Sequence, residues 1–143
     1  MKIKNKLINQ ITINGKKEIS EKILIKSLKE LQKNSTKKYK NIIQLVLIHT
    51  KPIFKLHIIK NKKRKKKRVK EIPGFIKNKS SRISLSMKFI LQNIKKGNNT
   101  FYKKLWKEIL LDAKNQGNSI QTKMELQKEI LTKKHYFRYY RWN

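Results

Sequence analysis

The stretch PIFKLHIIKNKKRKKKRVKEIPGFIK, residues 52–77, is the most informative about architecture, because two short apolar runs enclose a strongly basic segment. In the first run Phe54, Leu56 and Ile58 alternate with Lys55 and His57. A period of two is typical of a strand. The second run, VKEIPGFIK, carries Pro73, which a strand tolerates at a sheet edge or a bulge. The two runs predict a β-ribbon at about 53–77.

The tip of this ribbon would be almost entirely cationic. Its basic residues are Lys60, Lys62, Lys63, Arg64, Lys65, Lys66, Lys67, Arg68 and Lys70. Blocks of like charge are often disordered loops or localisation signals, and that alternative stays open. Strands on both sides would instead carry the charge beyond the body of the protein, where it can contact phosphates.

Three helices are predicted before the ribbon from apolar residues spaced three and four apart. They are a short helix around Leu7 and Ile11 that ends before Asn14-Gly15, a helix from Glu18 to about Gln32, and a helix from Tyr39 to His49. In the second helix Lys22, Lys26 and Lys29 lie opposite the apolar face. Pro52 ends the third helix because the residue before proline disfavours the α conformation.

Three more helices follow the ribbon, each with a start signal. The signals are an N-cap at Ser80 or Ser81, an N-cap at Thr100, and a capping box formed by Thr122 and Glu125. Gly97 and Gly117 are the expected stops of the first two. The sequence therefore predicts a mainly α protein, a bundle of about six helices with a protruding β-ribbon. Residues 1–143 are the right length for one domain.

The charge points to a polyanionic partner. The chain has 39 Lys and Arg against 8 Asp and Glu, a formal net charge of +31. Such a chain repels itself when compact, so a nucleic acid is the expected partner. An anionic membrane is the rival, but it needs a free apolar helix face, and the apolar faces here are needed to cover one another. We expect neither a spanning segment nor a secretory signal.

Enzymatic chemistry has few residues to use. Cysteine is absent, Asp112 is the single aspartate, and the three histidines (His49, His57, His135) are far apart in the sequence. No metal-ligand spacing, P-loop or dinucleotide motif occurs, and Glu125 and Glu129 are expected to pair with lysines. We predict a non-enzyme without metal or cofactor.

The C-terminal segment HYFRYYRWN, residues 135–143, combines aromatic rings with arginines. Such side chains stack on unpaired RNA bases, but they can equally cover the end of a helical core. We expect Phe137 and Tyr140 to point inward, and Arg138, Arg141 and Trp142 to point outward. Trp106 is expected to cover the core as well.

Lysine, isoleucine and asparagine dominate the composition, and only five basic residues are arginine. All three dominant residues have A/T-rich codons, which is typical of an AT-biased genome such as that of an organelle. The arginine side chain ends in a planar guanidinium group with several hydrogen-bond donors, which lysine lacks. The five arginines are therefore expected at positions where positive charge alone is not sufficient.

Several segments together resemble the bacterial-type ribosomal protein seven of the small subunit. These segments are INGKKEISEKILIKSLKEL (13–31), VLIHTKPIF (46–54), SRISLSMKFIL (81–91), LDAKNQGNSIQTKMELQKEI (111–130) and FRYYRW (137–142). The resemblance runs from about Leu7 to Trp142. The terminal YRW and the GKK at Gly15 are its most specific elements.

The resemblance implies a helical body with a protruding ribbon, bound to the 3′ major (head) domain of small-subunit rRNA. Members of this family start assembly of the subunit head and lie near the exit-site tRNA and the mRNA exit channel. Expected neighbours are head proteins nine, thirteen and nineteen and platform protein eleven. Matching basic positions add Lys16, Lys17, Lys77, Lys79, Arg82 and Lys88 to the expected RNA contacts.

The sequence departs from the family at the N-terminal arm, which is reduced to MKIKNK, and at the ribbon glycines, which are replaced by Lys and Arg. Its ending and composition resemble those of a protein encoded in an organelle, the mitochondrion before the plastid. The competing function is an architectural DNA-binding protein with a basic ribbon, although KNKKRKKKR lacks the apolar wedge such arms use. A membrane-active cationic helix protein is the second alternative.

Overall fold

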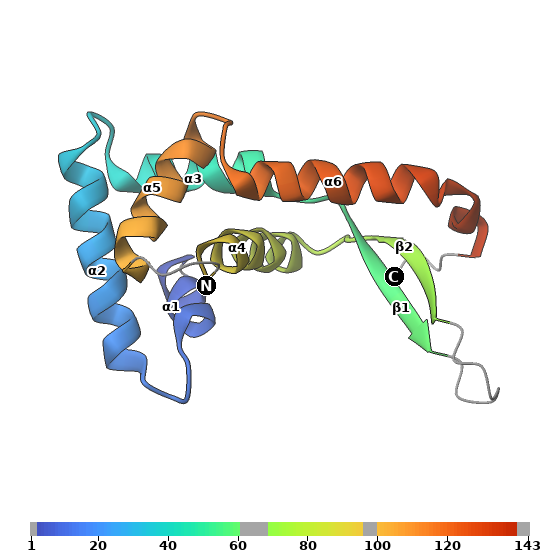
Figure 1. Cartoon of the computed structure of the whole chain (residues 1–143), viewed down its shortest axis with the longest axis horizontal. Coiled ribbons are helices and arrows are strands. Elements are labelled where there is room, and N and C mark those ends of the chain that lie inside the picture. Colours follow the sequence, from blue (N-terminus) through green and yellow to red (C-terminus); the bar gives the residue numbers. More distant parts are fainter. Residues whose placement is uncertain (1–2, 61–68, 96–99, 140–143) are drawn as a thin grey trace.

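A two-stranded hairpin projects from a helical body in the computed structural model, which describes residues 3–60, 69–95 and 100–139. Strand β1 (Phe54–Lys60) pairs antiparallel with β2 (Val69–Phe75), with Phe54 opposite Phe75 and Lys60 opposite Val69 (Figure 1). Pro73 lies opposite Leu56 and is tolerated because both strands are edges. The predicted ribbon is confirmed, whereas residues 61–68 at its tip lie outside the described residues.

The rest of the described chain is helical, as predicted. The α-helices are α1 (Ile3–Ile11), α2 (Lys17–Lys33), α3 (Tyr39–Thr50), α4 (Lys79–Lys95), α5 (Phe101–Ala113) and α6 (Asn118–Thr132). A short 3-10 helix, η1 (Lys134–Tyr139), follows α6. Helix α5 contacts α2, α3, α4 and α6, while α6 runs from this body to the hairpin (Figure 1).

The core lies where the apolar faces of α2, α3, α4 and α5 meet. Leu24, Leu31, Met87 and Leu105 are each at most 1% exposed, so they are fully removed from water. They come from positions that the three-and-four spacing marks as one face of each helix. Trp106 packs against the edge of this cluster, as expected. No helix in the described part of the chain combines the length and apolar character needed to cross a membrane.

Two of the predicted helix starts are wrong. Helix α4 begins at Lys79, and the Asn78 carboxamide oxygen accepts a hydrogen bond from the Ser80 backbone N–H at 2.8 Å, so Asn78 is the cap. The predicted capping box lies inside α6, where the Thr122 hydroxyl donates to the Asn118 carbonyl at 2.9 Å. Thr100 does occupy the N-cap position of α5, but its side chain makes no capping hydrogen bond. Gly97 lies outside the described residues.

The corner between α5 and α6 explains why α6 begins early. Helix α5 ends before Asn115, which has a φ of 64°, so Asn115 and not Gly117 takes the left-handed conformation. Gly117 is instead the N-cap of α6. The capping is done by α5: the buried Glu108 carboxylate accepts hydrogen bonds from the Ser119 N–H at 3.0 Å and hydroxyl at 2.9 Å.

Asp112 is buried beneath this corner. Its side chain is 0% exposed, and neither carboxylate oxygen accepts a hydrogen bond from a described residue. Burial, and after it the nearby Glu108 charge, raise the pKa of Asp112 to about 7. The Asp112 carbonyl lies 3.0 Å from His49 Nδ1, and Lys123 Nζ donates to the His49 carbonyl at 2.6 Å. Burial lowers the pKa of Lys123.

Gly117→Ala is expected to destabilise the fold by about 1–3 kcal/mol, the range for overpacking a tight site. A methyl group at Gly117 would overlap Asp112 Oδ1, so the corner must shift. The φ of Gly117 is −80°, an ordinary value, which leaves the clash as the cause. Urea denaturation measures the loss, with Gln116→Ala at the exposed neighbouring position as the control. A Gly117→Ala variant as stable as the wild type would contradict this close packing.

Candidate nucleic-acid interface

Aromatic side chains hold the base of the hairpin against the C-terminal end of the described chain. The Phe54 ring meets the Phe75 ring edge-on at 6.0 Å and the Phe137 ring at 5.7 Å, centroid to centroid. Phe137 reaches this position because η1 turns the chain back after α6. Phe137 therefore packs inward, but against the hairpin and not, as expected, against the end of the helical core.

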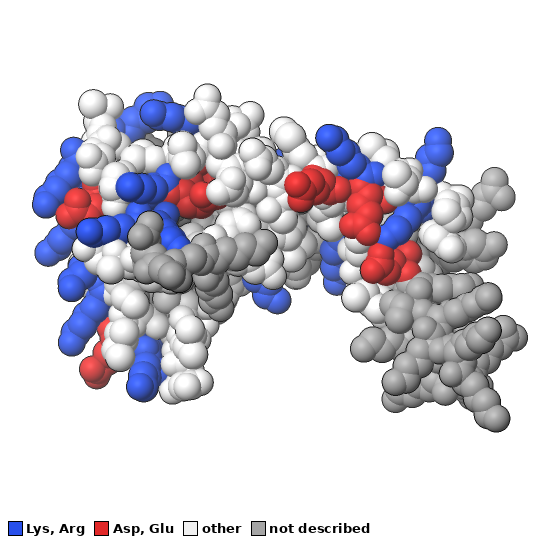
Figure 2. All heavy atoms as spheres, in the orientation of Figure 1, with Lys and Arg blue, Asp and Glu red and all other residues white. Residues whose placement is uncertain are grey.

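An ion cluster joins the hairpin to α6. Lys133 Nζ donates to Glu129 Oε1 at 2.6 Å and also to Glu71 Oε2 on β2. The hydrogen bond to Glu129, followed by the one to Glu71, raises the pKa of Lys133, and the hydrogen bond from Lys133 lowers the pKa of Glu71. The expectation that Glu129 pairs with a lysine is confirmed. Figure 2 shows that acidic side chains gather at this junction.

Lys133→Gln is expected to loosen the hairpin without unfolding the body, because it removes the one described cation shared by Glu71 and Glu129. Amides of β2 should exchange with solvent roughly threefold to tenfold faster, while those of α4 and α5 stay unchanged. Hydrogen exchange followed by mass spectrometry separates the two regions. Lys128→Gln, at an exposed position of α6, is the matched control. Equal exchange in β2 for both variants would show that the aromatic contacts alone fix the hairpin.

The basic residues after the hairpin divide into two kinds. Lys77, Lys79 and Lys88 are exposed, as contacts to phosphates require. Arg82 is half-buried: its Nε donates to the Ile76 carbonyl at 2.5 Å, and its guanidinium lies 4.9 Å from the Phe75 ring centroid. Arg82 therefore supports the hairpin base, a role for which a planar cation is suited and a lysine is not.

Lys16 and Lys17 lie at the turn between α1 and α2, and both are exposed. The turn needs Asn14 at a φ of 53° and Gly15 at a φ of 73°, which the sequence supplies with its two most permissive residue types. This turn and the hairpin lie at opposite ends of the molecule (Figure 1). Among the described residues, the predicted basic side chains therefore do not form one patch.

Helix α1 connects the two regions. Lys6 Nζ donates to the Ser80 carbonyl at 3.2 Å and to the Ser80 hydroxyl, and Gln10 Nε2 donates to the Ser84 carbonyl at 3.0 Å. These bonds fix α1 along the first half of α4, which begins directly after the hairpin. The distance between the basic turn and the hairpin is therefore set by packed helices.

Several predicted contacts lie outside the described residues or side chains and stay predictions. They are Lys60, Lys62, Lys63, Arg64, Lys65, Lys66, Lys67, Arg68, Lys70, Arg138, Arg141 and Trp142. Tyr140 lies outside as well.

The exposed side of α2 carries a basic row that the predicted contacts omit. Lys22, Lys26, Lys29 and Lys33 recur at four, three and four residues, and all are exposed. Figure 2 shows lysines and arginines gathered over the α2 end of the molecule. Lys33 also pairs with Glu30 at 3.4 Å. The spacing is visible in the sequence, so the row could have been recognised there as a candidate phosphate-binding surface.

Among the described residues, no group of three or more His, Asp or Glu side chains could hold a metal ion. The His57 pKa is lowered by burial and by the charge of Lys55, which makes this imidazole neutral more readily than usual. A neutral imidazole beside a lysine adds little to phosphate binding.

Comparison with known proteins identifies the family. Residues 1–133 match the family model described as ribosomal protein S7p/S5e. The chain is 30% identical to small ribosomal subunit protein uS7 of Wigglesworthia glossinidia brevipalpis, over 98% of this chain and 86% of that protein. It is 32% identical to small ribosomal subunit protein uS7c of Euglena longa, over 85% of this chain and 66% of that protein. The chain therefore belongs to the ribosomal protein S7p/S5e family and is a structural ribosomal protein, not an enzyme.

Proposed function

We propose that this protein is a structural constituent of the small ribosomal subunit that binds the 3′ major (head) domain of its rRNA and nucleates assembly of the head. One observation carries the proposal: a chain of the S7p/S5e family displays exposed lysines at two ends of a packed helical body. The names of the two relatives described above support the small-subunit role.

The mechanism is neutralisation of phosphates at a fixed spacing. Lysines displace counterions condensed on RNA and gain affinity without reading the base sequence. The turn at Lys16 and Lys17 would contact one rRNA segment, and Lys77, Lys79 and the hairpin would contact another. Because α1 and α4 hold these regions apart, the body selects RNA by the distance between its backbones.

The same proposal places residues 1–143, as one domain, near the exit-site tRNA and the mRNA exit channel. Head proteins nine, thirteen and nineteen and platform protein eleven would be its neighbours. No metal or organic cofactor takes part, since the contacts are between lysines and phosphates.

Filter binding to an isolated head-domain rRNA fragment, repeated over a range of salt concentrations, tests the proposal. The logarithm of the affinity should fall linearly with the logarithm of the salt concentration, by about 0.7–0.9 for each phosphate contacted. Affinity that is insensitive to salt would contradict it. Competition with duplex DNA tests the alternative function, that of an architectural DNA-binding protein. Preference for the duplex over the rRNA fragment would favour that alternative over rRNA binding.

The proposed location is an organellar ribosome, and the lysine, isoleucine and asparagine content supports a gene in an AT-rich organelle genome. The mitochondrion is our first proposal. The similarity to uS7c of Euglena longa supports the plastid as the alternative. Sedimentation of the protein with ribosomes from separately purified organelles distinguishes the two.

A further inference from the structure

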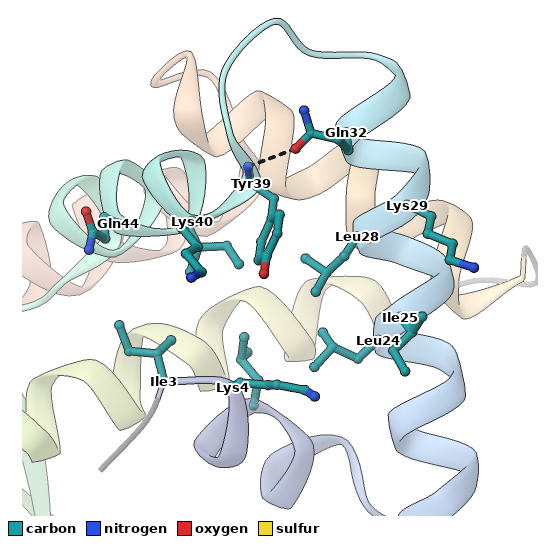
Figure 3. A pocket seen from close by; sticks show the side chains of 12 residues that line it. Ile3, Lys4, Leu24, Ile25, Leu28, Lys29, Gln32, Tyr39, Lys40 and Gln44 are labelled. Carbon is teal, nitrogen blue, oxygen red and sulfur yellow. Dashed lines mark hydrogen bonds between the residues drawn. The ribbon is translucent and has the colours of Figure 1, made fainter.

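An apolar groove of about 810 Å³ opens between α1, α2 and α3 (Figure 3). Helices α1 and α2 lie at the end of the molecule away from the hairpin (Figure 1). Its aliphatic lining consists of Ile3, Leu7, Leu24, Ile25, Leu28 and Ile43. Ile25 is 43% exposed and Tyr39, which also lines the groove, is 37% exposed, so the groove leaves apolar surface in contact with water. Apolar surface of this extent on a highly charged protein is typical of an interaction site.

Lysines surround the opening of the groove. Lys4, Lys29 and Lys40 belong to its lining, one from each of the three helices, and no Asp or Glu does. All three are exposed, and none forms an ion pair with another described residue. At the edge of the groove Gln32 Oε1 accepts a hydrogen bond from the Tyr39 N–H at 3.1 Å (Figure 3).

We propose that this groove binds an acidic amphipathic helix of a neighbouring protein in the assembled particle. Apolar side chains at positions i, i+3 or i+4, and i+7 of that helix would fill the aliphatic floor. Carboxylates flanking this stripe would pair with Lys4 and Lys40 (Figure 3). This inference rests on the proposed function in one respect: the proposed function names the small ribosomal subunit as the particle that contains the neighbouring protein.

The charge of the chain and the apolar lining of the groove favour an acidic helix over two other occupants, a second copy of the chain and an RNA base. A second copy of the chain would bring together two bodies of +31, which repel each other. An RNA base would leave its hydrogen-bonding edges unpaired on the aliphatic floor, at a considerable energetic cost. A helix that carries both apolar side chains and carboxylates matches the aliphatic lining of the groove and the lysines at its opening.

Photo-cross-linking from residue 25 in the native particle tests the proposal. A photoreactive phenylalanine analogue replaces Ile25, and the same analogue at Ile48, which is 67% exposed on α3, is the control. The expected product from position 25 is one protein segment whose apolar residues recur three and four positions apart and are flanked by acidic residues, absent from the control. Cross-links to rRNA, to a second copy of the chain, or to no macromolecule would each overturn the proposal.

A charge reversal then tests the rim. Lys4→Glu with Lys40→Glu should lower the yield of that cross-link at least tenfold, whereas Lys103→Glu with Lys114→Glu, at exposed positions outside the groove, should leave it unchanged. Equal cross-link yields in the two double variants would contradict the proposal that lysines at the groove pair with carboxylates of the bound helix. Products are identified in every fraction that contains the chain. Failure to sediment with the small subunit would therefore contradict the proposed function without affecting the interpretation of the groove.

Discussion

Asp112→Asn is expected to stabilise the protein above pH 7, by roughly 4 kcal/mol at its largest. In the folded protein burial raises the pKa of this carboxyl from its ordinary value of 3.8 to about 7. The folded state then holds a proton that the unfolded chain has already released, so stability falls as the pH rises from about 4 to about 7. Asparagine has nearly the same shape and cannot ionise, so the variant escapes this loss.

The measurement is urea denaturation of both proteins at a series of pH values from about 4 to about 8.5, which spans the window of the shifted pKa. The difference in unfolding free energy between variant and wild type should be near zero at the acid end, grow through about pH 5–7 and then level off. Taking the difference removes the contribution of the overall charge, which both proteins share. Gln121→Ala, at an exposed position of α6 that carries no ionisable group, is the control and should show no such growth. A difference that is constant with pH would mean that Asp112 does not titrate in this range.

Apolar spacing was sufficient to predict all six helices and the hairpin, because Leu24, Leu31 and Met87 recur on the buried face of their helices. The same reasoning failed where a partner comes from elsewhere in the chain. The start of α6 depends on Glu108, eleven residues before the Ser119 that it caps. A local capping box at Thr122 and Glu125 was the stronger signal within the sequence window, and it was wrong.

The candidate site was predicted less completely than the fold, for a related reason. Lysine identity alone placed Lys16, Lys77 and Lys79 correctly at the surface. Arg82 looked the same in the sequence, yet the carbonyl of Ile76 and the ring of Phe75 engage it. The groove could not be predicted either, because it exists only where α1, α2 and α3 meet.

The charge of the hairpin tip is expected to dominate rRNA binding. Replacing Lys63, Arg64, Lys65, Lys66 and Lys67 with serine removes five positive charges. If each contacts a phosphate, the salt slope should fall by about 4, and affinity near 0.1 M salt should fall on the order of 100-fold or more. Residues 61–68 connect Lys60 to Val69, and the strands are held at their base by Phe54, Phe75 and Lys133, so the helical body should not depend on them.

Filter binding to the head-domain fragment measures both quantities for the serine variant. The matched control replaces Lys63, Lys65, Lys66 and Lys67 with arginine. It keeps the charge, so it should keep the salt slope and bind within a few-fold of the wild type, because phosphate contacts need only a cation here. Circular dichroism of the serine variant should show unchanged helical content. Loss of that signal would mean that the tip is needed for folding, and an unchanged slope would mean that phosphates are bound by the lysines of α2 and α4 instead.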